Sequence, residues 1–237
     1  MKVVIFGANG VAGRLLTKQA LAQGHAVTAF TRHPNAFPLR DARLQVVGGD
    51  VLDPGAVGRA VAGQGAVLST LGVPYTLKEI TLYSRGMAHI VQAMNDCGVR
   101  RLVCVSSSAV DPHAGAHGGF LFEKVLVPLI THTIGRTTYA DQRRMEALVM
   151  SSGLDWTIVR PSGLFETPAV TDYRVAEVYI RGKFTSRADL ADCMLQELNS
   201  DRFQRKVVAV ATVSVKPNLL KVIATEALHK RDVQAPA

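Results

Sequence analysis

Gly7-Ala8-Asn9-Gly10-Val11-Ala12-Gly13 is the stretch that decides the fold of this 237-residue chain. It follows an apolar, β-rich run at residues 2–6 and precedes a run with helical periodicity at residues 14–21. Glycines at this spacing allow a tight turn, a close approach of a pyrophosphate to the backbone, and close packing of helix on strand. The helix then offers free N–H groups and the positive end of its dipole to phosphates. We therefore predict a dinucleotide-binding turn; the alternative is that the glycines only shape an edge of the sheet.

The remainder of the chain alternates between patterns typical of strands and patterns typical of helices. We expect strands at residues 2–6, 25–31, 44–47, 66–71, 101–105, 156–160 and 206–211. We expect helices at residues 14–21, 54–62, 76–95, 120–132, 139–151, 186–199 and 217–229. Strands that alternate with helices predict the α/β class, with a doubly wound parallel sheet of the Rossmann type.

The domain organisation follows from the same pattern. Residues 165–180 show no clear period, and we expect them to be irregular with room for a short strand pair. No internal repeat, low-complexity tract or linker interrupts the chain, so we expect a single domain over residues 1–237. Within this domain, residues after about 160 are expected to form a small C-terminal portion that covers the substrate.

Composition and charge limit the kinds of partner. Hydrophobic residues make up 48% of the chain and charged residues 19%, which is typical of a globular protein. No apolar run reaches the roughly 18–20 residues of a membrane span, and the N-terminus does not resemble a signal peptide. We therefore expect a cytoplasmic protein that does not bind membranes. The net charge is +8, but the basic residues are scattered, so we expect a phosphorylated small molecule rather than nucleic acid as the anionic partner.

The end of the second predicted strand indicates which dinucleotide is bound. Enzymes that use NAD place an acid there to hold the ribose 2′-hydroxyl. This chain has Thr31, Arg32 and His33 at that position and no acid. Arg32 can meet a 2′-phosphate through a charge-assisted contact, which an aspartate would repel. We predict NADP as the cofactor and leave NAD open; the alternative is that Arg32 is a solvated loop charge.

Two further strand ends supply predicted cofactor contacts. Asp50 and Val51 lie where the adenine would sit, and Asp50 can accept a hydrogen bond from the exocyclic amine of the adenine. Alternatively, Asp50 caps the helix that begins at Asp53-Pro54. Thr70, Leu71 and Gly72 end the fourth strand, where the nicotinamide ribose would lie. The cofactor-binding residues predicted from these patterns are Gly7, Asn9, Gly10, Val11, Gly13, Thr31, Arg32, Asp50, Val51, Thr70, Leu71 and Gly72.

Seven segments carry a resemblance to a known group. They are GANGVAG (7–13), TRHP (31–34), GDVLDP (49–54), STLG (69–72), RLVCVSSSAV (101–110), GLDWTIVRPSGL (153–164) and FTSRADLADCMLQELNSDRFQRKVVAVA (184–211). In this order they resemble the atypical short-chain dehydrogenase/reductases, and in particular NmrA-like proteins and the biliverdin reductase B and flavin reductase group. The resemblance extends to about residue 212. It implies NADPH bound in extended form across the strand ends, with its nicotinamide near Ser106–Ser108 and Pro161, which adds Ser106 and Pro161 to the cofactor set.

The resemblance also suggests catalytic residues. Orthodox members of the superfamily use a serine and a Tyr-x-x-x-Lys pair, in which tyrosine donates a proton. Here Ser108 lies at the matching strand end, and Tyr139 is followed four residues later by Arg143 instead of lysine. In one interpretation Ser108, Tyr139 and Arg143 form a modified catalytic set, although arginine cannot release a proton. In the other, Tyr139 is an ordinary residue at a helix start, Arg143 is a surface charge, and the protein works mainly by placing an acceptor over the nicotinamide.

These patterns favour an NADPH-dependent oxidoreductase that transfers hydride to a planar conjugated small molecule, such as a flavin, a quinone or a conjugated carbonyl. Two alternatives stay open, because a fold does not fix a function. The first is a non-catalytic dinucleotide sensor, as some NmrA-like proteins are, and the second is a reductase, isomerase or oxygenase of secondary metabolism. His113 and His117 lack an obvious third ligand, so we expect no metal site. Association into a homo-oligomer is also left open.

Overall fold

The computed structural model describes residues 1–111, 135–180, 182, 184–215 and 217. The strands are β1 (Lys2–Phe6), β2 (Ala26–Thr31), β3 (Leu44–Gly48), β4 (Ala66–Ser69), β5 (Arg101–Val105), β6 (Asp155–Pro161), β7 (Gly163–Phe165), β8 (Tyr173–Glu177), β9 (Phe184–Ser186) and β10 (Lys206–Thr212). The helices are α1 (Val11–Ala22), α2 (Pro54–Val61), α3 (Leu82–Asp96), α5 (Arg136–Ser151) and α6 (Arg187–Leu198), with short 3₁₀ turns η1 (Pro34–Ala36) and η2 (Ser108–Val110).

Eight strands form one sheet in the order β3-β2-β1-β4-β5-β6-β10-β8. All neighbours in this sheet are parallel except β8, which lies antiparallel to β10 at the edge. The structure therefore confirms the predicted doubly wound Rossmann fold. The order reverses between β1 and β4, and in sheets of this kind ligands bind at such a reversal, beyond the carboxyl ends of the strands.

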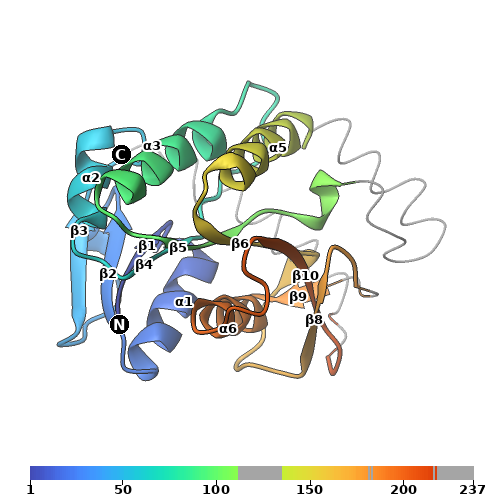
Figure 1. Cartoon of the computed structure of the whole chain (residues 1–237). Helices are drawn as coiled ribbons and strands as arrows, with labels where there is room; N and C mark the ends of the chain where they lie inside the picture. The colour runs from blue at the N-terminus through green and yellow to red at the C-terminus, as the bar shows by residue number, and fades with distance from the viewer. Residues whose placement is uncertain (112–134, 181, 183, 216, 218–237) are drawn as a thin grey trace.

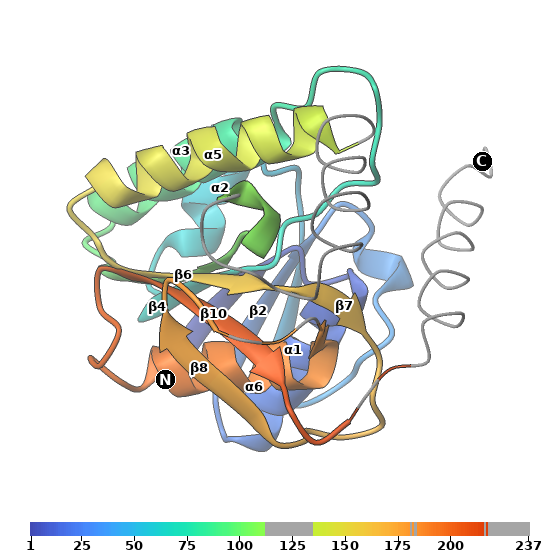
Figure 2. The ribbon, with the colours of Figure 1, turned by 90° about the vertical axis from the view of Figure 1, so that its right-hand side faces the viewer.

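Helices cover both faces of the sheet, α2, α3 and α5 on one side and α1 and α6 on the other (Figures 1 and 2). Successive residues of β1 point to opposite faces, so Val4 and Phe6 pack in one hydrophobic core and Val3 and Ile5 in the other. Because both faces are buried, the strand reads in the sequence as a continuous apolar run. The two cores fix the sheet and the helices as a rigid support for the strand ends.

The N-terminal ends of α1, α3 and α5 also lie at the carboxyl edge of the sheet. Helix α1 starts directly after the turn that follows β1. Helices α3 and α5 end only a few residues before β5 and β6, respectively. Since each strand begins at the opposite edge, the N-terminal turns of α3 and α5 lie at the same edge as the carboxyl ends of the strands. The predicted cofactor and catalytic residues are therefore concentrated at one edge.

Among the boundaries that differ between the sequence-based expectation and the structure, two border the same segment. The helix predicted at residues 76–95 begins only at Leu82, because Asp141 of α5 binds the first N–H groups of the helix, those of Tyr83 at 2.8 Å and Ser84 at 3.3 Å. The strand predicted at residues 66–71 ends at Ser69. These two changes leave residues 70–81 as a non-helical segment that spans from β4 to α3.

The region expected to be irregular contains the strand β8, and β7 lies just before it. They do not pair with each other: β8 pairs with β10, and β7 pairs with β9 in a separate two-stranded sheet. The helices predicted at residues 120–132 and 217–229 lie outside the described residues. Within the described part of the chain, no helix has both the length and the apolar character that crossing a membrane requires.

Candidate functional site

The glycine turn after β1 leaves no room for side chains at two of its positions. Gly7 has a φ of +76°, and a Cβ atom there would lie 2.6 Å from the carbonyl oxygen of Thr70. A Cβ atom at Gly13 would overlap the carbonyl oxygen of Gly7 and lie 2.8 Å from the Cα of Ala8. The Gly7 carbonyl also accepts the N–H of Gly10 at 3.1 Å. Only glycine is compatible with this backbone path at Gly7 and Gly13.

The N-terminus of α1 is available to an anion. Its N-cap residue Gly10 has no side chain to bind the first N–H groups, and the first turn contains no acidic residue. These N–H groups and the helix dipole favour a negatively charged ligand. The exposed Arg14, which the sequence analysis did not single out, donates from Nε to the Asn9 side-chain oxygen at 3.0 Å. This hydrogen bond ties a positive charge to the glycine turn.

The ends of β2 and β3 are joined by backbone hydrogen bonds. The N–H of Gly49 donates to the Thr31 carbonyl at 3.0 Å, and the Thr31 hydroxyl accepts from the N–H of His33 at 3.2 Å. Thr31 is buried, whereas Arg32 and His33 are exposed. The structure therefore places Arg32 as an exposed residue at the carboxyl end of β2.

The two interpretations of Asp50 are partly resolved. Helix α2 is capped by Asp53, whose carboxylate accepts from the N–H groups of Gly55 at 2.9 Å and Ala56 at 3.2 Å. Asp50 instead accepts from the N–H of Leu52 at 2.9 Å. The alternative in which Asp50 caps the helix is therefore wrong, because Asp53 already binds those two groups. A contact between Asp50 and an adenine stays a prediction.

Thr70, directly after β4, is hydrogen-bonded to the end of β1 and to the glycine turn. Its N–H donates to the Phe6 carbonyl at 2.9 Å, and its hydroxyl lies 3.2 Å from the carbonyls of both Phe6 and Gly7. Gly72 is different, because no atom lies within 4 Å of the place where its Cβ would be. The chain after β4 is thus fixed at Thr70 and has free space beside Gly72.

The serines after β5 differ in their hydrogen bonding. Ser106 is buried, and its hydroxyl has no hydrogen-bond partner among the described residues. Ser107 caps η2 by accepting from the N–H of Ala109 at 3.2 Å. Ser108 begins η2 and is half-buried. A buried hydroxyl without a partner is costly, so Ser106 offers an unused hydrogen bond to a polar ligand at this strand end.

Tyr139 and Arg143 have different partners on α5. Tyr139 is buried in the first turn of the helix, and its hydroxyl lies 2.7 Å from the hydroxyl of Tyr75. Arg143 is an exposed residue, but its Nε donates to the carbonyl of Val110 at 2.9 Å and so fixes α5 to η2. Arg143 is thus more than the free surface charge of one interpretation. The two elements that carry Ser108, Tyr139 and Arg143 are therefore joined.

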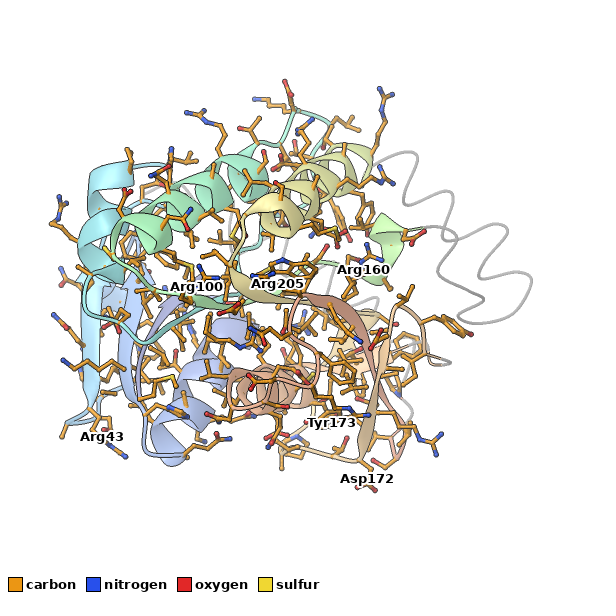
Figure 3. The ribbon with its side chains drawn as sticks, in the orientation of Figure 1. Arg43, Arg100, Arg160, Asp172, Tyr173 and Arg205 are labelled. Atoms are coloured by element: carbon orange, nitrogen blue, oxygen red, sulfur yellow. The ribbon has the colours of Figure 1, made fainter. Side chains whose placement is uncertain are left out.

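A buried charged pair beneath this region was not predicted. Arg160, next to Pro161 at the end of β6, binds the carboxylate of Glu146 through two hydrogen bonds of 2.9 and 2.6 Å. Its second partner is Asp111, at 3.6 Å, and Figure 3 shows Arg160 between the sheet and the helix above it. Burial opposes the charge of Arg160 and lowers its pKa, but Glu146 and Asp111 together outweigh this effect, so the pKa lies above the ordinary value. An arginine within an apolar strand predicts an acidic partner for its charge, but the sequence does not identify which acid this is.

The SRADLA segment at the start of α6 holds the C-terminal portion together. Ser186 caps the helix by accepting the N–H of Asp189 at 3.0 Å. The buried carboxylate of Asp189 accepts from the N–H of Thr171 at 2.7 Å and its hydroxyl at 2.8 Å, and also from the hydroxyl of Thr212. Tyr173, which is labelled in Figure 3, donates to Asp192 of the same helix at 2.6 Å. Burial, and then this carboxylate, raise the pKa of Tyr173.

The fold and the glycine turn define a Rossmann-type protein, and a family comparison agrees. The model of a family described as NAD(P)H-binding matches residues 7–201, so the chain belongs to this family. An uncharacterised protein from Mycobacterium tuberculosis is 26% identical over 212 residues, which is 88% of this chain but 20% of the relative. The chain therefore spans about a fifth of the length of the mycobacterial relatives it matches.

Solved structures show the same fold. A short-chain dehydrogenase/reductase from Veillonella parvula in complex with NADP has a TM-score of 0.76 at 21% identity, covering 92% of this chain and 99% of its own. The anaerobilin reductase ChuY from Escherichia coli O157:H7 has a TM-score of 0.72 at 22% identity, covering 92% and 100%. At these identities the likeness concerns the fold.

In the part of the chain that the structure describes, no group of three or more His, Cys, Asp or Glu side chains is arranged to hold a metal ion. His113 and His117 lie outside the described residues.

Proposed function

We propose that this protein is an NADPH-dependent oxidoreductase that reduces a planar conjugated small molecule, such as a flavin, a quinone or a conjugated carbonyl. The observation that carries the proposal is the cradle after β1, where Gly7 and Gly13 have no room for a Cβ atom. An uncapped helix N-terminus lies beside this cradle. Membership of an NAD(P)H-binding family supports the same cofactor class.

The residues of the site fit an extended dinucleotide. The turn from Gly7 to Gly13, with Asn9, Gly10 and Val11, would hold the pyrophosphate on backbone N–H groups. At the other strand ends, Thr31 and Arg32 would hold the 2′-phosphate, Asp50 and Val51 the adenine, and Thr70, Leu71, Gly72, Ser106 and Pro161 the nicotinamide ribose and ring. The unused hydroxyl of Ser106 and the free space at Gly72 are observations that favour this placement.

The remaining residues have roles toward the acceptor. Bound NADPH supplies the hydride. Tyr139 presents a buried hydroxyl that can donate a proton, and Ser108 lies on η2, which Arg143 holds against α5. In the C-terminal portion, Phe165 and Phe184 pack edge to face with ring centroids 6.4 Å apart. We infer that this aromatic pair and its two-stranded sheet form the apolar wall against which a planar acceptor packs.

A non-catalytic dinucleotide sensor is the second candidate. One observation favours it: Arg143, which stands where orthodox members of the superfamily have lysine, uses its Nε to bind the Val110 carbonyl. A protein that only senses the dinucleotide would need the cradle but no proton donor. Both candidates therefore bind the dinucleotide, but only the oxidoreductase turns over an acceptor.

The first experiment is a parallel fluorescence titration of the wild type and Arg32→Asp with NADPH and NADH. We expect Arg32→Asp to weaken NADPH binding at least about tenfold and NADH binding little, because a charge-assisted phosphate contact is worth about 1.5–3 kcal/mol. Arg43→Asp is the matched control, since Arg43 is an exposed arginine of the same β2–β3 connection. Equal losses for both dinucleotides would contradict the 2′-phosphate assignment.

Turnover is then measured with FMN, menadione and a conjugated aldehyde as acceptors. NADPH oxidation that depends on one of these acceptors supports the oxidoreductase. Tight dinucleotide binding without turnover on any acceptor would favour the sensor instead.

A further inference from the structure

We propose that Tyr75 is a proton-relay residue, whose hydroxyl positions and reprotonates that of Tyr139 and so takes over part of the role that lysine has in orthodox members of the superfamily. This inference rests on the proposed oxidoreductase function. It assigns a role to a residue in the segment between β4 and α3, which the sequence analysis did not single out.

The contact between the two tyrosines is the central observation. Their hydroxyl oxygens are 2.7 Å apart, and their rings pack at 6.1 Å with an interplanar angle of 55°. Tyr139 is 6% exposed, whereas Tyr75 is 36% exposed. A phenol can donate one hydrogen bond while it accepts another. The pair therefore connects a buried hydroxyl at the carboxyl edge of the sheet to a side chain that reaches solvent.

Arg143 cannot perform this relay. Its Nε already donates to the carbonyl of Val110 at 2.9 Å. A guanidinium also stays protonated, so it cannot pass a proton on. A group that exchanges a proton with Tyr139 must come from elsewhere in the site, and Tyr75 is in hydrogen-bond contact with it.

The segment that carries Tyr75 is held by hydrogen bonds on both sides of this residue, to α5 downstream and to α3 upstream. The hydroxyl of Thr137 donates to the carbonyl of Thr76 at 2.9 Å. Upstream of Tyr75, the N–H of Val73 donates to the hydroxyl of Tyr83 at 3.2 Å. The same segment begins with the Thr70–Gly72 residues to which we assign the nicotinamide ribose. Tyr75 is therefore fixed in the chain close to the proposed reaction centre.

The proton balance of the step is simple. The acceptor gains a hydride from the bound dinucleotide and a proton from Tyr139, so the phenolic O–H bond of Tyr139 breaks as an O–H or N–H bond of the acceptor forms. Tyr75 donates its proton to the Tyr139 oxygen and takes a proton from water. The net consumption is one hydride and one proton per acceptor, and both tyrosines return to their starting state.

Tyr75→Phe tests the relay with the acceptor that gives the highest wild-type turnover in the panel of FMN, menadione and a conjugated aldehyde. We expect kcat to fall about ten- to a hundredfold, as for the loss of a hydrogen bond to a charged oxygen, while the Kd for NADPH stays within about twofold. We also expect a changed solvent deuterium isotope effect on kcat. An unchanged kcat would overturn the relay while leaving the proposed function intact.

Three further variants separate a relay from a structural role. Leu77→Ala alters the same segment at a side chain that is 80% exposed, and we expect it to leave kcat unchanged. Tyr75→Phe should cause no further loss in a Tyr139→Phe background, because both changes break one chain of hydrogen bonds. Tyr75→His, which can donate and accept, should restore part of the turnover, and it serves as the main test if Tyr75→Phe does not fold.

The remaining outcomes are also decisive. Additive losses in the double variant, or no recovery in a folded Tyr75→His, would contradict the relay. Absence of wild-type turnover with every acceptor would overturn the proposed function and the relay with it.

Discussion

In residues 1–111 the candidate site is formed mostly by backbone atoms, whereas in residues 135–217 it is held in place by buried charged side chains. The first region contributes the glycine turn and the uncapped N-terminus of α1. Its buried residues include only one histidine, His25, and no carboxylate or guanidinium. All the buried acids and arginines among the described residues belong to the second region: Asp141, Glu146, Arg160, Asp189 and Glu197.

The difference reflects two ways of fixing a site. A cradle of backbone N–H groups needs only glycine and a helix start, both of which are local in the sequence. The second region must instead hold strand ends and connecting segments that come from distant parts of the chain. Buried carboxylates do this well because each accepts several hydrogen bonds, but a buried charge that loses its partner is strongly destabilising. We therefore expect mutations in the second region to affect mainly folding and mutations in the first to affect mainly binding.

The largest expected effect is on the buried Arg160–Glu146 pair. Glu146→Gln removes the charge that compensates Arg160, so we expect the free energy of unfolding in urea to fall by about 3–5 kcal/mol. The matched control is Glu177→Gln, which breaks an exposed ion pair with Lys206 and should cost at most about 1 kcal/mol. A loss at Glu146 no larger than the loss at Glu177 would remove the distinction between the two regions.

The next effect is on the glycine cradle. Gly13→Ala places a Cβ atom against the backbone of Gly7 and Ala8, which must move. We expect the Kd for NADPH to rise at least about a hundredfold, or about 2.8 kcal/mol, in a fluorescence titration. Gly58→Ala is the control, since no atom lies within 4 Å of its Cβ position in α2, and it should leave binding unchanged. NADPH binding by Gly13→Ala as tight as that of the wild type would show that the cradle does not hold the dinucleotide.

The smallest of these effects compares a remote helix cap with a local one. Asp141 lies on α5 and caps the start of α3, so Asp141→Ala removes this cap. We expect the free energy of unfolding to fall by about 2 kcal/mol. Asp53→Ala removes the local cap of α2 and should cost about 1 kcal/mol. Urea titrations of both variants provide the measurement. A greater loss at Asp53 would mean that the long-range contact contributes less than the local one.

Much of the fold could be predicted because its signals are local. The apolar run of β1, the glycine turn and the periodicity of α1 lie next to one another, and the Asp53-Pro54 pair marks the start of α2. The beginning of α3 could not be placed in the same way, since its N-cap residue Thr81 makes no side-chain cap and Asp141 takes that role from 58 residues away. Similarly, the sequence shows an arginine at position 160 but not that Glu146 and Asp111 are its partners.

The amino-acid sequence by itself determined the sheet class, the glycine turn between β1 and α1 and the lack of an acid after β2, because each depends on residues that are close together in the chain. Only the tertiary structure decided which hydroxyl meets Tyr139, where Arg143 is bound and how the SRADLA segment holds Thr171 and Thr212. These contacts join segments far apart in the sequence, and many side chains of the right type could have supplied them. The packing of the two helix layers on the sheet determines which of these side chains makes each contact. No local sequence pattern can show this choice.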